Sequence, residues 1–384
     1  MKFCSIICEY NPFHNGHLYQ LQEAKRRSGA DALLCMMSGN FVQRGEAAVL
    51  NKFTRAKHAV QAGADIVVEL PTVFATSNAE LFAKGAISIL SAIPCVSSLC
   101  FGAENADGNS FLHAADLLNH EPKTVSERLK ANVASGMSYA KARANAWEGL
   151  LSTDLLCSPN NILGLEYTRA ILEKNAAIEI LPMERIGSGY NDERLQENYS
   201  SATAIRASIQ RGVSCAQNLP DFVQADLPSR LEDTLDILEK YAVLSRSAEE
   251  IATTCDCTEG LENALKKAAL LPQTLAETLT SARYTTSRIR RIALQNLLQI
   301  EEKLVKESLQ APLYLRILAI RKERSDLLSA LSSSSLPILI RANDKDSLTG
   351  VAKKVYERDA FAEKVYDLLY PESCDKNVFF MIRQ

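Results

Sequence analysis

The chain begins with Phe3-Cys4-Ser5-Ile6-Ile7-Cys8, an apolar run that passes directly into Glu9-Tyr10-Asn11-Pro12-Phe13-His14-Asn15-Gly16-His17. A helical pattern follows over residues 17–27 and stops at Gly29. This order of strand, loop and helix start opens a series in which short apolar runs alternate with helical patterns. Such alternation is typical of βαβ units and a parallel sheet.

Outward from this segment, we expect an α/β domain over residues 1–210. Its predicted strands are residues 3–8, 32–37, 66–70 and 96–101, with helices over 17–27, 52–62 and 79–92. The pattern is helical over 106–147 and 161–174, and extended over 178–181. A chain of 384 residues is long enough for a second domain.

Residues 211–384 are predicted to form that second, mostly helical domain. Its helices are expected at 227–244, 261–270, 286–298 and 352–369, with one strand at 337–341. The serine run 332–335 has the composition of a short linker.

The composition favours a cytosolic protein without a structural metal. No uncharged apolar stretch is long enough to span a membrane, so no membrane partner is expected. The chain has ten cysteines, and several lie inside apolar runs, which predicts reduced core thiols. Cys255 and Cys257 are the only close pair of cysteines, and no histidine or second cysteine pair lies near them in the sequence. We therefore predict no metal site.

The net charge of −3 is unevenly distributed along the chain. Residues 281–324 contain ten basic residues and four acidic ones, so this segment carries +6. A basic segment in an acidic chain suggests contact with phosphate groups.

The loop after the first strand has features of a phosphate site. In an open α/β sheet it lies at the carboxyl edge of the strands, with the amides of the next helix facing an anion. Gly16 allows close backbone approach, and His14 and His17 lie on one helix face where both can donate to phosphate oxygens. For a lone histidine, capping of the helix is the simpler interpretation.

The string His14-Asn15-Gly16-His17 resembles the HxGH motif of the nucleotidylyltransferase superfamily. Ser200-Ser201-Ala202-Thr203-Ala204-Ile205-Arg206 is similar to the Ser-Ser-Thr-x-x-Arg loop with which that superfamily grips the leaving phosphates. It lacks the lysine, so Arg206 would carry the charge alone. An ordinary helix cap at Ser201 or Thr203 is the alternative. The fold class that this resemblance implies is a Rossmann-like nucleotidyltransferase domain followed by the helical domain.

A longer resemblance points to the bacterial tRNA(Met) cytidine acetate ligase family. The matching blocks are residues 8–17, 37–46, 101–104, 158–164 and 185–190, and residues 283–289 are similar to the carboxyl-terminal domain of that family. The resemblance implies that acetate and ATP form acetyl-adenylate and pyrophosphate. The acetyl group then passes to N4 of the wobble cytidine of elongator tRNA(Met). Mg²⁺ and the oligomeric state are left open.

The same resemblance implies the site residues. His14, His17 and Arg206 are predicted to be catalytic, because they would stabilise charge that builds on the pyrophosphate. The implied ATP-binding positions are Ile7, Cys8, Glu9, Tyr10, Asn11, Pro12, Phe13, His14, Asn15, Gly16, His17, Leu18, Tyr19, Gln20, Gly102, Asn160, Arg185 and Ser201.

Several positions keep two interpretations. Asn161 could face ATP in place of Asn160, and Arg185 could be a surface ion-pair partner. The polar residues of segment 38–46 are expected to shape the acceptor side of the cleft. Lys52 and Arg55 share a helix face and are either functional or solvated.

Arg283, Arg288 and Arg291 are predicted to bind RNA. Arg288 and Arg291 share the polar face of an amphipathic helix, where phosphate contact would be independent of sequence. Solvated surface is the alternative for this face. Tyr284 could stack on an unpaired base or belong to the core.

Two other functions compete with the ligase. One is adenylation of a small phosphorylated metabolite, which usually needs only a compact α/β domain. The other is a noncatalytic tRNA-binding protein with a regulatory nucleotide site, for which the presence of His14, Gly16, His17 and Arg206 is unexpected.

Overall fold

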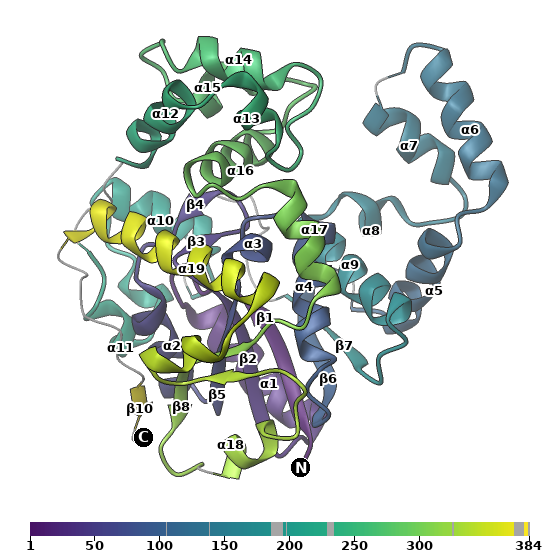
Figure 1. The fold of residues 1–384 in the computed structure, drawn as a ribbon. Helices are drawn as coiled ribbons and strands as arrows, with labels where there is room; N and C mark the ends of the chain where they lie inside the picture. Colours follow the sequence, from purple (N-terminus) through teal and green to yellow (C-terminus); the bar gives the residue numbers. More distant parts are fainter. Residues whose placement is uncertain are drawn as a thin grey trace.

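The chain forms a mixed α/β structure around one central sheet (Figure 1). The computed structural model describes residues 1–104, 106–137, 139–185, 195–196, 198–228, 234–324, 326–371 and 380–382. The strands are β1 (Phe3–Cys8), β2 (Ala32–Ser38), β3 (Phe41–Val42), β4 (Glu46–Ala47), β5 (Ile66–Leu70), β6 (Val96–Ala103), β7 (Glu179–Glu184), β8 (Leu315–Arg321), β9 (Ile338–Leu339) and β10 (Phe380–Ile382).

Each predicted helical range contains a helix of the structure. The helices are α1 (Asn15–Ser28), α2 (Lys52–Gln61), α3 (Thr72–Ala75), α4 (Ala79–Leu90), α5 (Gly108–Asn119), α6 (Lys123–Ala134), α7 (Tyr139–Trp147), α8 (Thr153–Cys157), α9 (Pro159–Glu173), α10 (Ala202–Gln210), α11 (Asp221–Gln224), α12 (Leu235–Ser245), α13 (Ala248–Ala252), α14 (Leu261–Ala268), α15 (Leu275–Leu279), α16 (Thr286–Leu297), α17 (Glu302–Gln310), α18 (Asp326–Leu331) and α19 (Gly350–Leu369). Of these, α3, α8, α10, α11, α13, α15, α17 and α18 were not predicted. Two 3₁₀ turns are Ala216–Asn218 and Ala342–Ser347.

The sheet has the strand order β10-β8-β5-β2-β1-β6-β7, and β9 pairs with β8. The central strands β5, β2, β1, β6 and β7 are parallel, which confirms the predicted α/β class. The chain leaves β1 toward β2 and β5 and later returns to the other side of β1 with β6. This reversal of direction opens a crevice at the carboxyl ends of β1 and β6.

Alternate residues of each central strand face two separate cores. On β2, Leu34 and Met36 join the core under α3, α4, α5, α9 and α19, whereas Leu33 and Cys35 join the core under α1, α2, α10 and α11. Both faces are therefore covered by helices, as the continuous apolar strands require. Cys4, Cys8, Cys35 and Cys100 are buried and free, in agreement with the expectation of core thiols.

The part of the chain after residue 210 differs from the expected single helical domain. Helices α12–α16 form a lobe with its own apolar core, which lies at the top of Figure 1. Beyond this lobe, β8 joins the central sheet antiparallel to β5, and α19 packs against α3. The predicted strand at 337–341 is only the two-residue β9, and β8 was not predicted. The division at residue 210 stays a prediction.

A buried cluster of charges attaches this returning segment to the sheet. The Lys52 ammonium lies 2.6 Å from Glu69 and also pairs with Glu363 of α19. Arg316 of β8 lies 3.3 Å from Glu69 and 2.7 Å from Glu363. Although burial alone would raise it, the two cations lower the pKa of Glu363 to about 2. Arg316 interrupts the apolar pattern of β8, which explains why the strand was missed.

We expect Lys52→Met to destabilise the protein strongly. The Lys52 side chain is 1 % exposed, and its loss leaves two buried carboxylates with one cation. Breaking a buried pair in this way costs about 3–5 kcal/mol. Urea unfolding measures the change, with the more exposed Lys57→Met on the same helix as the control. A difference below about 1 kcal/mol between the two variants would contradict the importance of the cluster.

Candidate active site

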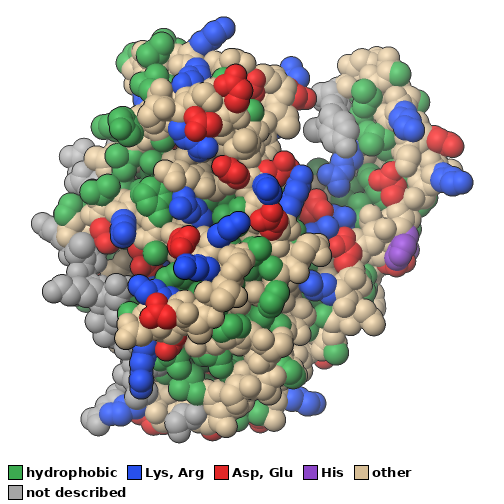
Figure 2. Space-filling model, viewed as in Figure 1, with side chains coloured by type: hydrophobic (Ala, Val, Ile, Leu, Met, Phe, Trp, Pro, Cys, Tyr) green, Lys and Arg blue, Asp and Glu red, His purple; other side chains and the backbone are tan. Residues whose placement is uncertain are grey.

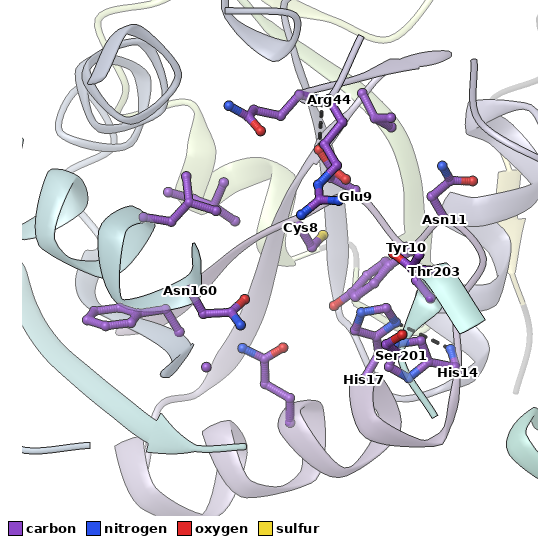
Figure 3. Close-up of a pocket in the computed structure, with 18 of the residues that line it drawn as sticks. Cys8, Glu9, Tyr10, Asn11, His14, His17, Arg44, Asn160, Ser201 and Thr203 are labelled. Carbon is purple, nitrogen blue, oxygen red and sulfur yellow. Dashed lines mark hydrogen bonds between the residues drawn. The ribbon is translucent and has the colours of Figure 1, made fainter. Parts of the chain in front are cut away.

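The pocket lies at the crevice between the carboxyl ends of β1 and β6 (Figure 3). β1 supplies its last residues and the loop that follows, β6 supplies Phe101 and Gly102, and α9 and α10 close two sides. The residues that were predicted for the site and line this pocket are Ile7, Cys8, Glu9, Tyr10, Asn11, His14, His17, Gln20, Gly102, Asn160, Arg185, Ser201 and Arg206.

The remaining predicted positions lie beside the pocket. Gly16 and Tyr19 line a smaller adjacent cavity. Phe13 is fully buried against Tyr10, with ring centroids 4.8 Å apart, and the Asn15 amide donates to two backbone carbonyls. Pro12 and Leu18 are likewise not among the pocket residues. Phe13 and Asn15 thus hold the loop in place and do not line the pocket themselves.

The two histidines form one unit at the start of α1. His14 caps the helix by accepting the Gly16 N–H at Nδ1, over 3.1 Å, and its own N–H donates to Nδ1 of His17 over 3.3 Å. Their rings are stacked with centroids 3.6 Å apart. Because both Nδ1 atoms accept hydrogen bonds, each neutral ring carries its hydrogen on Nε2. Helix capping and donation to an anion are therefore compatible roles.

The environment keeps both rings uncharged. Burial, reinforced by the nearby Arg185 and Arg206, lowers the pKa of His14 to about 3. Burial, His14 and Arg185 likewise hold the pKa of His17 well below its usual range. The pair thus offers two neutral N–H donors near two guanidinium groups. Such preorganised donors favour negative charge on a bound group.

The second predicted motif also faces the pocket. Ser201 caps α10 by accepting the Ala204 N–H over 3.0 Å, and Ala202 and Thr203 line the pocket beside it. One turn into the helix, the Arg206 guanidinium donates to the Asn11 carbonyl over 2.8 Å and lies 3.4 Å from Glu46. The start of α10 therefore presents a helix N-terminus and a cation to the pocket.

The structure separates Asn160 from Asn161. Asn160 lines the pocket, and its amide donates to Glu104 over 2.7 Å. Asn161 is fully buried, where its side chain accepts the Glu104 N–H and donates to the Asp154 carbonyl. Only Asn160 is thus in a position to meet a pocket ligand. Arg185 lies 3.4 Å from the Asn160 oxygen and lines the same wall. Residues 186–190 of the matching block lie outside the described residues.

An apolar wall of the pocket was missed by the sequence analysis. It consists of Phe82 from α4, Phe101 from β6, and Leu163 and Tyr167 from α9. The Tyr167 ring centroid lies 5.9 Å from that of Phe101 and 6.4 Å from that of Phe82. Phe101 and Leu163 lie inside the matching blocks 101–104 and 158–164, whereas Phe82 and Tyr167 carried no sequence signal of their own.

The segment between β2 and α2 forms the opposite wall. Gln43, Arg44 and Glu46 line the pocket, as expected for its polar residues. Lys52 and Arg55 are neither solvated nor in the pocket, since both are buried. The Arg55 guanidinium donates to the carbonyls of Glu9 and of residues 38, 39 and 50. Arg55 thus holds the loops after β1 and β2 in place through hydrogen bonds to their backbone carbonyls.

The basic segment 281–324 does not form one surface patch. Arg316, Arg321 and Arg324 pair with carboxylates of the α/β part, and Figure 2 shows basic side chains mixed with acidic ones over the lobe. Arg283 is 63 % exposed beside Glu259, and Arg288 donates to the Asp256 carbonyl. The Arg291 side chain is only 13 % exposed and lies 3.9 Å from Asp256. Burial of Arg291 disfavours its predicted RNA contact.

Arg290 of the same helix lines a groove next to the pocket and was not predicted as a site residue. Its guanidinium pairs with one oxygen of Glu46, whose other oxygen faces Arg206. Tyr284 lies between Arg283 and Arg288, whose guanidinium carbons are 5.5 Å and 5.2 Å from its ring centroid. Within the described ranges, no group of three or more His, Cys, Asp or Glu is arranged to hold a metal ion. None of the described helices is long and apolar enough to cross a membrane.

Comparison with known proteins places this site in a family. A family model described as HIGH Nucleotidyl Transferase matches residues 1–378. The crystal structure of apo Thermotoga maritima TmcAL superposes with a TM-score of 0.91, at 29 % identity over 100 % of both chains. The form bound with α-thio ATP gives a TM-score of 0.87, also at 29 % identity over 100 % of both chains. The fold and the paired histidines thus define a HIGH nucleotidyl transferase.

The sequence relatives narrow this class further. The tRNA(Met) cytidine acetate ligase of Caldanaerobacter subterraneus subsp. tengcongensis is 36 % identical over 96 % of each chain. That of Acetivibrio thermocellus is 36 % identical over 96 % of this chain and 95 % of its own. The chain belongs to the tRNA(Met) cytidine acetate ligase family, which confirms the resemblance seen in the motifs.

We expect His14 and His17 to stay neutral between about pH 5 and pH 8, with hydrogen on Nε2. Burial and the neighbouring guanidinium groups oppose protonation of either ring. Nitrogen-15 NMR of the imidazole rings reports both the charge and the tautomer, and His17→Gln identifies which signals belong to the pair. Titration of either ring in this range would contradict the proposed environment.

Proposed function

We propose that this chain is an ATP-dependent ligase that acetylates N4 of the wobble cytidine of elongator tRNA(Met). The observation that carries the proposal is the pocket at the β1/β6 crevice, where two neutral histidines and two arginines converge on one space. The relatives named tRNA(Met) cytidine acetate ligase, which align over nearly the whole chain, supply the substrate.

In the first step, an acetate oxygen attacks the α-phosphorus of ATP, and pyrophosphate leaves. We assign the phosphates to the region of His14, His17, Arg185, Arg206 and the N-terminus of α10. Neutral Nε2–H donors and guanidinium groups stabilise the charge that develops on the departing oxygens. The aromatic wall around Phe101 offers an apolar surface for the adenine base. Mg²⁺ enters this proposal only as the counter-ion that ATP brings with it.

In the second step, the cytidine amine attacks the acetyl carbon, and AMP leaves with the bridging oxygen. The tRNA must then lie where the α/β part meets the lobe, because α16 reaches the pocket wall through Arg290 and Glu46. Cytoplasmic location belongs to the same proposal, since the substrate tRNA is found there.

The competing functions are less well supported. An enzyme that adenylates a small metabolite would have no use for a lobe that reaches its active site, whereas the family relatives match this chain through the lobe. A noncatalytic nucleotide sensor would not need two histidines with aligned donors. We therefore retain the ligase.

Incubation of the protein with ATP, labelled acetate and tRNA should give labelled N4-acetylcytidine at the wobble position and release pyrophosphate. The reason is that an acyl-adenylate forms by attack at the α-phosphorus. Nucleoside mass spectrometry and a pyrophosphate assay measure the two products. His17→Ala should slow pyrophosphate release on the order of 100-fold, because one donor to the developing charge is lost. ADP formed in step with product would exclude this mechanism.

Replacing Arg283 and Arg288 together by alanine should weaken tRNA binding and its salt dependence. If both contact phosphates, the slope of log affinity against log salt falls by about 1.4–1.8 units. Binding titrations at several salt concentrations measure it. Lys303→Ala with Lys306→Ala on α17 is the matched control, since both are exposed cations outside the lobe. Equal slopes in the two double variants would place the tRNA elsewhere.

A further inference from the structure

The acetyl-transfer step requires a proton acceptor, whereas the adenylation step does not. Acetate is already an anion and needs no proton acceptor when it attacks phosphorus. The exocyclic amine of cytosine is a weak nucleophile, because its lone pair is delocalised into the ring. It must lose a proton as its bond to the acetyl carbon forms. If the proposed function is correct, the pocket should therefore contain a base that only the second step uses.

Most titratable groups of the pocket are unsuited to that task. His14 and His17 already carry a hydrogen on Nε2, and both Nδ1 atoms are occupied. The Cys8 thiol donates to the Met36 carbonyl, the Tyr10 hydroxyl shares a hydrogen bond with Cys35, and burial raises the pKa of both groups. These four side chains are donors in their resting state.

Glu46 is also unsuited, although it is a carboxylate. One oxygen pairs with Arg290 and the other lies 3.4 Å from Arg206. Both oxygens are therefore occupied by guanidinium groups, and neither is open to a substrate amine. Of the carboxylates that line the pocket within the described residues, only Glu9 is left.

Glu9 is held in a way that leaves one oxygen available. Its Oε1 accepts the Gln43 N–H over 2.8 Å, and its backbone carbonyl accepts from Arg55. Among the described residues Oε2 has no hydrogen-bond partner, and the carboxylate forms no ion pair within 4.0 Å. The side chain is thus oriented from both ends, and it lines the pocket.

The surroundings of Glu9 favour proton uptake. Burial raises the pKa of this carboxyl, and the charge of Glu46 acts in the same direction. The Gln43 N–H, Arg206 of α10 and Arg55 of α2 oppose the increase. Arg44 is the other charged residue of the adjoining wall. A carboxylate with a raised pKa is a better proton acceptor near neutral pH than a solvated one.

Glu9 also lies toward the side from which RNA would arrive. The phosphate end of the pocket, with His14, His17 and Ser201, is continuous with a small cavity. The other end shares Arg44 and Glu46 with a groove of about 800 Å³ between α10 and the lobe, and Thr203 and Arg206 of α10 line both spaces. Gln43, which binds Glu9, belongs to the wall at this second end. A base swung out of the tRNA through this groove would meet Glu9 before the histidines.

We propose that Glu9 is the general base of the acetyl transfer and accepts a proton from the N4 amine at Oε2. The N4 lone pair forms the bond to the acetyl carbon, and the bond from that carbon to the bridging oxygen breaks. AMP departs with the electron pair of that bond. The proton passes from the protonated carboxyl to solvent after AMP and the acetylated tRNA leave, which restores the carboxylate.

The test is Glu9→Gln, because the amide keeps the shape and the Oε1 acceptor for Gln43 but cannot act as the base. Two reactions of the same adenylate are compared, both with the full-length protein. One is acetylation of tRNA, and the other is formation of acetohydroxamate when hydroxylamine replaces tRNA. Hydroxylamine is a strong nucleophile that needs no base. The ratio of the tRNA rate to the hydroxylamine rate should fall about 100-fold or more.

The pH dependence supplies a second readout. In the unchanged protein, single-turnover transfer to tRNA should fall as the pH drops through the raised pKa of Glu9, and this inflection should be absent in Glu9→Gln. The matched control is Glu46→Gln, the other carboxylate of the pocket. It should keep the inflection, since Glu9 is unchanged, whereas loss of the contact with Arg290 alters tRNA binding and not this pH dependence.

Three results would overturn the inference. A Glu9→Gln variant whose two rates fall equally would make Glu9 a positioning residue. An unchanged inflection in that variant would assign the proton to another group. Failure of the unchanged protein to acetylate tRNA, with acetohydroxamate still formed, would instead refute the proposed tRNA substrate and the role of Glu9 with it.

Discussion

Arg55 is the constraint on which the site depends. Its guanidinium is fully buried and has no carboxylate within ion-pair distance among the described residues, so its charge is satisfied by carbonyl oxygens. Those carbonyls belong to the residue after β1, to the end of β2 and to the residue before the cap of α2. One side chain thus fixes the relative position of three loops at the carboxyl edge of the sheet. If these carbonyl acceptors were lost, a buried cation would remain without hydrogen bonds, at a large cost in folding free energy.

The pocket that these loops help to form has two chemically different ends. At one end, uncharged histidines and guanidinium groups present donors only, which suits a polyphosphate that gains charge. At the other end, the carboxylates of Glu9 and Glu46 lie beside Arg44. This division separates the groups that stabilise an anion from a group that can take a proton. Figure 3 shows the separation, with Ser201 and the histidines grouped apart from Glu9 and Arg44.

The lobe contacts the wall of the pocket at Gly45 and Glu46. Gly45 adopts a left-handed backbone, with φ of 74°, and its missing side chain lets the backbone of α16 approach closely. Next to it, Glu46 is shared by Arg206 of α10 and Arg290 of α16. A displacement of α16 would therefore act on Glu46 and, through Glu46, on Arg206, which the proposed function places beside the phosphates. The lobe thus directly contacts a residue that lines the pocket, in addition to offering a surface for RNA.

The sequence by itself determined the elements whose signals are local. The apolar run 3–8 and the glycine and histidine spacing predicted a strand, a loop and a helix start, and the serine motif at 200–206 was compatible with a phosphate loop or a helix cap; all of them reach one pocket. Only the tertiary structure decided what faces these elements. Tyr167, Phe82 and Arg290 looked like core or surface residues because the groups they meet are distant in the chain. Strand β8 was not predicted because Arg316 interrupts its apolar pattern. The partners that allow this charge to be buried, Glu69 and Glu363, are brought to it only by folding. Local periodicity reports the conformation of a segment, whereas burial and charge pairing depend on which segments the sheet brings together.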